Sequence, residues 1–567
     1  MARRPAHDVL ILGSGLAGSI AGACLARAGL DVLIIDAGHH PRFAVGESTI
    51  PYTSTMTRLI AERYGVPEIK HLSTYESVQA HISTNCGVKR NFGFLHHEPG
   101  RPHDPARAHQ FPISKIAHTE SHFLRADVDH WLARLAQRYG ARLREDTRVA
   151  DVRESDEAMT LVLADGEEIE GRFLIDASGF RSPLAQRFGL REEPTRLRTH
   201  SRSIFTHMTG VAPFESTLPS PRSHGNPSPW SEGTLHHLFP GGWMWVIPFD
   251  NHARATSDLC SVGISYDPRI HPKPDDGPQA EFDRFLADYP DVRRQFTGAE
   301  AVRPWVSTGR LQYSSTRTVG ARWCLTAHAA GFIDALFSRG MQNTMVILHA
   351  LIWRIIDAMR DDDFTVERFK AVEELEQGLL DVNDFLVAGA YTSFGHWELW
   401  DAWFRIWETG QVLSTMEVGR AYARFLAERD PRVLDRLARI EADGALPEYP
   451  PVRELMSEAD RLVRDVQEGR RGPADAAAQI FARLAEADFV PPPFGLADRD
   501  RRWFSVTPAR VARTLLWARL QAPPEIGRLF AEGIGLPLRR RLSSKEYKVR
   551  QEVVHAMARR IGARKAG

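Results

Sequence analysis

Cysteine is scarce in this sequence, and so is lysine. Four cysteines are spread over 567 residues, and none belongs to a CxxC pair of the kind that binds zinc or supports a redox couple. We therefore predict no metal site, and the low cysteine content favours a reducing, cytoplasmic location. Only eight lysines stand beside 64 arginines, so a lysine inside an apolar segment is unusual here.

Long apolar runs and an excess of one charge are also missing. The first hydrophobic stretch, residues 9–26, is interrupted by four glycines, and no later segment has about 18 uninterrupted apolar residues. Basic and acidic residues number 72 each, which gives no support for nucleic acid or an anionic membrane as a partner. We predict a soluble globular protein that is long enough for several domains.

A glycine-rich turn follows the first apolar run, at residues 8–12. The turn is Gly13-Ser14-Gly15-Leu16-Ala17-Gly18, and a helical pattern (19–28) and a second apolar run (31–36) follow it. The glycines permit a close approach to a pyrophosphate, the helix directs its N-terminal amides at that charge, and Asp36 can hydrogen-bond a ribose hydroxyl. The spacing predicts a βαβ unit that binds a dinucleotide.

Two later segments return to the same predicted sheet. Residues 172–176 form a strand that ends at Asp176, and residues 322–326 form another that leads to Ala330 and Gly331. Together with the first unit, these two returns favour an FAD fold over a plain NAD dehydrogenase. We predict an α/β, FAD-binding Rossmann-like fold of the flavin hydroxylase type, with an inserted substrate β-sheet and a C-terminal helical region.

The predicted domains follow from these segments. Residues 1–360 form the FAD-binding module, and residues 361–567 form the helical region. Within the module, the nucleotide fold occupies about 1–75, 115–189 and 310–360. The inserted sheet occupies about 76–114 and 190–309. A tail at 539–565 carries ten basic and two acidic residues, which is typical of a solvated helix.

Several motifs resemble those of one enzyme family. Three of them are PRFAVGES at 41–48, WMWVIP at 243–248 and GFIDALFSRG at 331–340. Together they resemble the flavin-dependent halogenases, and the second matches the WxWxIP signature of that family at Trp243, Trp245 and Pro248. The phenolic branch of the family is the most similar, through residues 87–94, 203–208 and 366–380. The resemblance covers about the first 400 residues.

The resemblance implies an enzyme with two sites. Reduced FAD and dioxygen would oxidise a bound chloride or bromide to hypohalous acid, which would pass through an internal tunnel to a lysine beside an aromatic substrate. Lys89 occupies the lysine position of the phenolic branch, where it would hydrogen-bond hypohalous acid or form a haloamine. The backbone amides of Arg339 and Gly340 would hold the halide. In addition to the glycine turn and Asp36, the resemblance assigns cofactor contacts to Glu47, Ser48, Arg125, Asp176, Ala330, Gly331 and Met341.

The resemblance also implies the reaction partners. The substrate would be a phenolic or polyketide-derived aromatic of secondary metabolism, either free or tethered to a carrier protein, and we expect chlorination. We see no second dinucleotide fingerprint, so a separate flavin reductase would supply FADH2. A flavin-dependent aromatic hydroxylase and a non-catalytic flavin-binding protein remain alternatives, although Lys89 and the WxWxIP motif argue against both.

The residues alone leave several roles open. In an extended 86–94 segment, Lys89 lies on the face opposite Phe92 and could project into a pocket, whereas lysine is usually solvated. Arg125 could contact flavin or form a surface ion pair, and residues 338–340 could be an ordinary loop before a helix at 343–360. The aromatic run 391–407 is more typical of core than of a substrate chamber.

Two positions depart from related enzymes. Phe337 stands where the tryptophan halogenases place a glutamate, so no second catalytic acid can be assigned there. His328 stands where many flavin hydroxylases place an aspartate.

Overall fold

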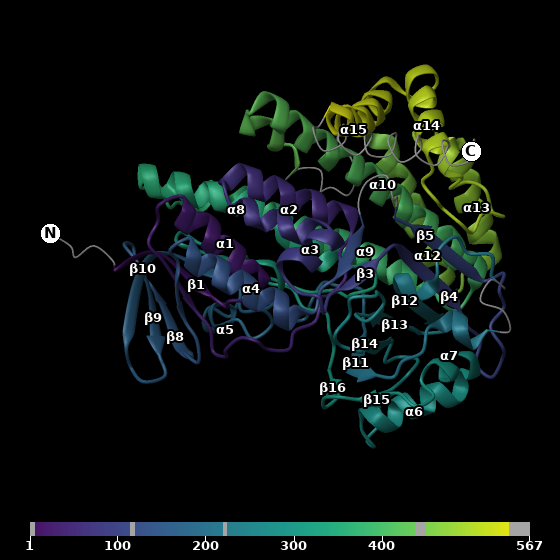
Figure 1. Cartoon of the computed structure of the whole chain (residues 1–567), viewed down its shortest axis with the longest axis horizontal. Helices are drawn as coiled ribbons and strands as arrows, with labels where there is room; N and C mark the ends of the chain where they lie inside the picture. The colour runs from purple at the N-terminus through teal and green to yellow at the C-terminus, as the bar shows by residue number, and fades with distance from the viewer. Residues whose placement is uncertain (1–5, 114–118, 219–223, 438–448, 544–567) are drawn as a thin grey trace, which may run out of the picture.

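A mainly parallel β-sheet forms the nucleotide-binding half of the chain (Figure 1). The computed structural model describes residues 6–113, 119–218, 224–437 and 449–543. Strands follow the order β7-β2-β1-β10-β9-β8, with β17 beside β10. Their bounds are β1 His7–Leu12, β2 Val32–Ile35, β7 Arg142–Arg144, β8 Val149–Glu154, β9 Met159–Leu163, β10 Glu168–Asp176 and β17 Trp323–Leu325. β2, β1, β10 and β17 run parallel, and β1, β2 and β17 are apolar along almost their whole length because helices and loops cover both faces.

Three helices that cover this sheet bring the cofactor motifs together. They are α1 (Leu16–Arg27), α4 (Arg125–Arg138) and α8 (Arg339–Asp361), and α1 packs on both of the others. Gly22 of α1 lies against β2, since a Cβ there would come within 2.6 Å of Ile34 Cδ1. Close packing of this kind fixes the start of α1 directly beyond the end of β1.

A second sheet, largely antiparallel, lies beside the first (Figure 1). Its order is β15-β11-β14-β13-β12-β4-β5, with β16 beside β11. The bounds are β4 Asn91–His96, β5 Ala108–Pro112, β11 Arg202–Thr209, β12 Thr234–Phe239, β13 Gly242–Pro248, β14 Cys260–Tyr266, β15 Glu300–Ala301 and β16 Val306–Ser307. A separate two-stranded ladder joins β3 (Gly87–Lys89) to β6 (Glu120–His122).

The two faces of the second sheet contribute to different cores. Along β13, Trp243 and Trp245 join the core shared with the nucleotide half and the long helices, whereas Met244 and Val246 join a core covered by α6 (Pro278–Asp288) and α7 (Pro290–Gln295). Alternate side chains of a strand point to opposite faces, which explains this division. The WxWxIP signature therefore presents both tryptophans to the same side.

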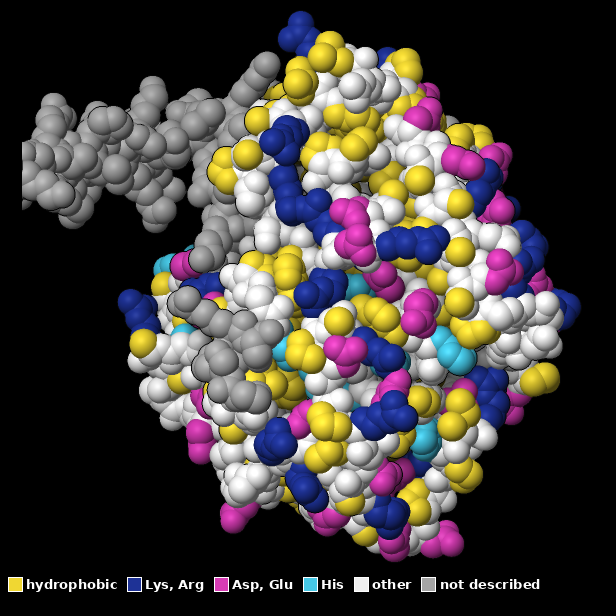
Figure 2. All heavy atoms as spheres, turned by 90° about the vertical axis from the view of Figure 1, so that its right-hand side faces the viewer, with side chains coloured by type: hydrophobic (Ala, Val, Ile, Leu, Met, Phe, Trp, Pro, Cys, Tyr) yellow, Lys and Arg dark blue, Asp and Glu magenta, His cyan; other side chains and the backbone are white. Residues whose placement is uncertain are grey.

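Beyond Asp363 the described chain is mainly helical, and an isolated β-bridge joins Trp503 to Gln110 of β5. The helices are α9 Val366–Ser393, α10 Trp397–Glu428, α12 Pro450–Gln467, α13 Pro473–Glu486, α14 Pro508–Leu520 and α15 Pro524–Ser543, and earlier ones are α2 Pro51–Tyr64, α3 Tyr75–His81 and α5 Pro183–Arg187. α10 packs on α2, α9, α13 and α15. Among the described helices, none has the length and apolar content to cross a membrane. On the face seen in Figure 2, basic and acidic side chains are intermingled.

The fold class is confirmed, but the helix predicted at 343–360 has a different start. α8 begins at Arg339 and not at 343, because Ser338 adopts a left-handed conformation (φ 54°) that turns the chain directly into the helix. Of the basic tail, residues 539–543 end α15, and the remainder lies outside the described residues. The domain boundaries stay a prediction.

Candidate active site

The glycine turn forms an open cradle at the N-terminus of α1. Gly13 has φ +93°, and a Cβ on Gly18 would lie 1.9 Å from the Gly13 oxygen, so both positions require glycine. A Cβ on Gly15 would meet nothing nearer than 3.7 Å, so the backbone there is open to a ligand. Leu16 and Ala17 begin α1, whose first turn has no acidic residue and no capping side chain. This geometry fits the pyrophosphate of FAD.

Asp36 closes one side of the cradle, where its carboxylate is already engaged by the protein. The backbone N–H and the hydroxyl of Ser14 both donate to its Oδ2 at 2.7 Å, and Arg42 forms a two-pronged ion pair with it. Burial opposes ionisation, but the hydrogen bonds from Arg42, Ser14 and Gly38 outweigh it and lower the pKa of Asp36 to about 2. A ribose contact would add to this network and stays a prediction.

The two other strand ends form tight internal turns. Asp176 accepts hydrogen bonds from the hydroxyls of Ser178 and Ser182, both at 2.6 Å, so its carboxylate fixes the turn after β10. The Ala330 oxygen accepts from the Ser315 hydroxyl at 2.7 Å. Gly331 packs closely, since a Cβ there would lie 2.7 Å from a leucine side chain. Both turns are fixed by contacts within the protein, and cofactor contacts at these residues stay predicted.

One short segment connects the cofactor side of the molecule to Lys89. Arg125 donates to the Gly46 oxygen at 3.1 Å and pairs with Asp129, whose carboxylate faces Gly15. Glu47 Oε1 lies 2.9 Å from His207 Nε2. The next two residues, Ser48 and Thr49, accept from Lys89: its Nζ donates to the Ser48 hydroxyl at 2.7 Å and to the Thr49 oxygen at 2.8 Å. The PRFAVGES motif thus borders both predicted sites.

The predicted halide residues begin a helix. Arg339 and Gly340 are the first two residues of α8, and the backbone N–H groups of a first helical turn point out of the helix at its positive end, which favours an anion. A Cβ on Gly340 would lie 3.1 Å from His328 Nε2, so this imidazole lies against the helix end. Met341, the third residue, is buried. Of the loop considered from the sequence at 338–340, only Ser338 lies outside the helix.

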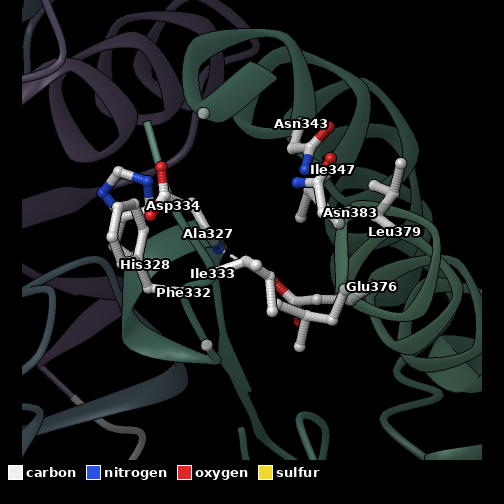
Figure 3. A pocket seen from close by; sticks show the side chains of 13 residues that line it. Ala327, His328, Phe332, Ile333, Asp334, Asn343, Ile347, Glu376, Leu379 and Asn383 are labelled. Atoms are coloured by element: carbon white, nitrogen blue, oxygen red, sulfur yellow. Dashed lines mark hydrogen bonds between the residues drawn. The ribbon is translucent and has the colours of Figure 1, made fainter. Parts of the chain in front are cut away.

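A small cavity lies beside this helix end (Figure 3). His328 and Phe332 line one side of it, and Asn343 of α8 and Glu376 of α9 line the other. Glu376 accepts a hydrogen bond from the Ala327 backbone N–H at 2.8 Å, which holds Ala327 in its left-handed conformation (φ 54°). The turn that carries His328 is therefore fixed from beneath by α9.

Lys89 is fully buried at the end of β3, which excludes the solvated surface lysine. Its Nζ lies 3.7 Å from the centroid of the Phe92 ring. The alternation that placed Lys89 and Phe92 on opposite faces is wrong, because no single strand spans 86–94. The strand breaks at Arg90, whose backbone N–H bonds to Glu232 and whose carbonyl accepts from Ile113.

Burial dominates the electrostatics around Lys89. It lowers the pKa of Lys89 well below its ordinary value, and the charge of Glu120 opposes that shift. Burial also lowers the pKa of His122 to about 3, and His122 lies between the oxygens of Pro248 and Thr234 at 2.9 and 3.0 Å. Burial of Lys89 therefore favours its uncharged amine, the form that can act as a nucleophile, and the neutral His122 adds no positive charge beside it.

A row of aromatic rings leads from Lys89 to the signature tryptophans. The Phe92 ring stacks on His236 at 5.0 Å between centroids, His236 lies 5.5 Å from Trp243, and Trp243 lies 5.4 Å from Trp245. Trp243 and Trp245 are buried. These rings form a continuous wall beside Lys89.

The aromatic run at 391–407 reaches this wall at one end. Trp407 stacks on Phe337 at 4.8 Å between centroids and lies 5.7 Å from Phe92. At the other end, the Tyr391 hydroxyl donates to Asp334 at 3.1 Å, and burial raises the pKa of Asp334 to about 6. Most of the run is core, as predicted, and Trp407 occupies the space beside Phe337.

Comparison with known proteins now gives the family. The profile described as tryptophan halogenase matches residues 8–79 and 101–402, and Lys89 lies between the two matched segments. Tetracycline 7-halogenase from Kitasatospora aureofaciens is 45% identical over 526 residues, which are 93% of this chain and 95% of that protein. Monodechloroaminopyrrolnitrin halogenase PrnC from Pseudomonas fluorescens is 45% identical over 539 residues, covering 92% and 93%.

Solved structures agree with these relatives. The crystal structure of the halogenase PltM in complex with phloroglucinol and FAD superposes with a TM-score of 0.84 at 32% identity, covering 88% of this chain and 100% of that one. The family profile, the relatives and the fold together identify the class as flavin-dependent halogenases. The chain belongs to the tryptophan halogenase family of these enzymes, and it uses reduced FAD and a halide. The likeness extends beyond residue 400, further than the motifs indicated.

Three residues of the site were not identified from the sequence. Arg42 pairs with Asp36, Thr49 accepts from Lys89, and Glu120 lies opposite Lys89 across the β3–β6 ladder. Arg42 and Thr49 lie within or beside the PRFAVGES motif, which could have indicated them. Glu120 carries no local signal, because the ladder that places it is formed by segments about thirty residues apart.

Proposed function

We propose that this halogenase transfers halogen, chiefly chlorine, to an electron-rich phenolic or polyketide-derived aromatic through Lys89. One observation carries the proposal: the Lys89 amine is fully buried, held by Ser48 and Thr49, and lies against an aromatic wall. Lysine is almost never fully buried unless its amine has a specific task or partner. A buried amine that favours the uncharged form suits the capture of an electrophilic halogen.

The other residues divide the work between two sites. When bound, FADH2 would supply the chemistry by which dioxygen oxidises the halide. The glycine turn and α1 would bind its pyrophosphate, and the first amides of α8, at Arg339 and Gly340, would hold the halide beside it. Trp243 and Trp245 would keep the organic substrate away from the flavin, so that halogen and not oxygen reaches the ring.

Relatives with different degrees of sequence identity to this chain support one class of substrate. Two relatives at 45% identity are named for the halogenation of tetracycline and of monodechloroaminopyrrolnitrin, two different aromatics. A relative named for a pyrrole on a peptidyl-carrier protein is 24% identical. We therefore propose a free aromatic substrate for this chain. We further propose a cytoplasmic setting in secondary-metabolite biosynthesis, in which a separate reductase supplies FADH2.

A product assay tests this function. The purified protein is incubated with FAD, a flavin reductase, NADH, oxygen and sodium chloride or bromide, with phloroglucinol as the probe. Mass spectrometry is expected to show a product with the isotope pattern of the added halogen, and Lys89→Ala is expected to abolish it. Addition of one oxygen in place of halogen would identify a hydroxylase and contradict the proposal.

A further inference from the structure

A chain of hydrogen bonds leads from Lys89 to a buried histidine. Lys89 Nζ donates to the Ser48 hydroxyl at 2.7 Å, and the hydroxyl oxygens of Ser48 and Thr234 lie 2.8 Å apart. The Thr234 hydroxyl lies 3.0 Å from His122 Nε2, and His122 Nδ1 lies 2.9 Å from the Pro248 oxygen. All four distances are those of ordinary hydrogen bonds. Two hydroxyl groups therefore connect the Lys89 amine to the imidazole of His122.

The Pro248 oxygen fixes the direction of every link in this chain. A carbonyl oxygen can only accept, so His122 Nδ1 carries the hydrogen that is donated to Pro248. In the neutral imidazole Nε2 is then an acceptor, and Thr234 donates to it. Because the one hydroxyl hydrogen of Thr234 is used there, Ser48 donates to Thr234 and accepts from Lys89. All the hydrogens point from Lys89 toward His122, which is the arrangement that a proton needs to pass along the chain.

Paired backbone segments hold the four residues of the chain. Lys89 on β3 and His122 on β6 belong to one ladder, and Ser48 forms an isolated bridge with His122. Thr234 begins β12, where it pairs with Phe92 of β4. Lys89 and His122 are both 0% exposed. The Lys89 amine therefore has no surface through which a proton could leave to solvent, and the chain is an internal route for it.

Burial acts on both ends of this route. It lowers the pKa of Lys89 well below its ordinary value and that of His122 to about 3, and the charge of Lys89 adds to the effect at His122. Because burial disfavours the charge at either end, its effect in part cancels when the proton passes from one end to the other. The departure of charge from Lys89 also removes the second cause of the lowered pKa of His122.

Other titratable groups lie near the chain. The charge of Glu120 favours the proton at the Lys89 end, whereas burial favours its departure. His236 has a pKa lowered to about 3 and Cys86 one raised to about 12, both chiefly by burial, so both are uncharged at neutral pH. The remaining groups are Glu47, which pairs with His207 at 2.9 Å, and Arg58, whose charge acts on Glu120. The opposed influences on Lys89 suit a proton that moves out and back.

We propose that His122 is the proton acceptor of Lys89. The hydroxyls of Ser48 and Thr234 carry the ammonium proton to His122 Nε2 before the amine takes up halogen, and they carry it back when the halogen leaves. This inference rests on the proposed function, in which Lys89 carries the halogen. His122 and Thr234 act through Lys89, so they are positioning residues.

The balance of protons and electrons in the cycle is complete. In the outward transfer each hydroxyl accepts one hydrogen and gives up its own, so Lys89 becomes a free amine and His122 an imidazolium. The amine electron pair then forms an N–X bond with the halogen of hypohalous acid, the O–X bond breaks, and the hydroxide leaves as water with one amine proton. The returning proton converts the haloamine to a haloammonium, from which the ring carbon takes the halogen and leaves a neutral amine. That amine accepts the ring proton, so Lys89 and His122 end as they began.

Removal of one hydroxyl interrupts the chain without removing the amine. Thr234→Val is expected to reoxidise FADH2 at the native rate and to keep the native KM for phloroglucinol, but to lose about 10²-fold in the rate of halogenation. Thr234→Ser keeps the hydroxyl, so its rate should stay near native. Thr206→Val is a matched control and should halogenate at the native rate, because Thr206 is a buried threonine of β11 whose hydroxyl donates to the Arg303 oxygen at 2.9 Å.

A solvent isotope experiment detects the moving protons themselves. Reduced, FAD-loaded enzyme with phloroglucinol and sodium bromide is mixed with oxygenated buffer in rising fractions of D₂O. Flavin absorbance is recorded, and product is quantified after rapid quenching within one turnover. Three protons move together in the native chain, so the halogenation rate should fall along a bowed curve, which should become linear in Thr234→Val.

A second variant tests the far end of the chain. His122→Asn keeps an amide N–H for the Pro248 oxygen but lacks Nε2, so it should show the same loss of halogenation and the same linear curve as Thr234→Val. It also serves as the test variant if Thr234→Val does not fold.

Different results overturn the two proposals. Native halogenation by Thr234→Val, or a bowed curve that persists in Thr234→Val or His122→Asn, would refute the proton route. An equal loss in Thr206→Val would refute it as well. Native halogenation by Lys89→Ala would instead overturn the proposed function, whereas inactive Lys89→Ala beside fully active Thr234→Val would refute the proton route alone.

Discussion

Halide oxidation and carbon–halogen bond formation are expected to separate when Lys89 is truncated. Lys89→Ala removes an amine that donates to Ser48 and Thr49 at 2.7 and 2.8 Å. The glycine turn and the start of α8 lie on other elements, so FAD binding and flavin reoxidation should continue at near-native rates. Hypohalous acid would then form without a group to receive it.

The magnitude of the loss follows from the role of the amine. A side chain that positions and activates a reacting group contributes about 10²-fold or more in rate, so halogenation should fall by at least that factor. Truncation also empties a fully buried site, at a cost of about 2–5 kcal/mol in the free energy of unfolding. Lys89→Met fills most of the same volume without an amine, so it should retain stability and still fail to halogenate.

Stopped-flow flavin absorbance, paired with product quantification, measures the two events on one sample. Lys89→Arg should fail as well, because guanidinium stays protonated and is wider than an amine. Free hypohalous acid, trapped by an added scavenger, should account for the missing product. Near-native halogenation by both the Ala and the Met variants would refute the reasoning and remove Lys89 from the mechanism.

Four further predictions concern the cofactor site, the reductant, acid stability and the tail. In Gly15→Ala the new methyl group has no atom nearer than 3.7 Å, so the variant should keep the native melting temperature and bind FAD more weakly by calorimetry. In Gly18→Ala the methyl group would lie 1.9 Å from a backbone oxygen, so both the melting temperature and the affinity for FAD should fall. The purified protein alone should oxidise NADPH negligibly, and rapid substrate-stimulated consumption would point to a hydroxylase. Burial lowers the pKa of His103 to about 3 and of His237 to about 4, so the unfolded chain binds more protons than the folded protein between pH 6.5 and 4. As the pH falls through that window, each residue should lower the free energy of unfolding by about 1.4 kcal/mol per pH unit. Equal urea midpoints at pH 7 and pH 5 would contradict this. Deletion of residues 544–567 should leave turnover intact, and an inactive truncated protein with native circular dichroism would assign the tail a catalytic role.

Local spacing was enough to predict the nucleotide-binding unit. The strand, glycine turn, helix and Asp36 lie within about thirty consecutive residues, so their geometry depends on backbone preferences that the sequence displays directly. The WxWxIP segment is similar, because the period of a strand alone sends Trp243 and Trp245 to one face. The motifs and their order along the chain are likewise features of the sequence, and they indicate the enzyme family.

The burial and the charge of Lys89 depend on the tertiary structure. Sequence alternation placed it opposite Phe92, whereas the break at Arg90 brings its amine onto the Phe92 ring. Its burial results from the close approach of the segment before α2, and its carboxyl neighbour, Glu120, is set by a register between distant strands. Motifs can therefore indicate which lysine belongs to the active site. The charge of that lysine depends on its desolvation and on nearby charged groups, which only the folded chain supplies. These are properties of the surrounding space and not of the neighbouring sequence.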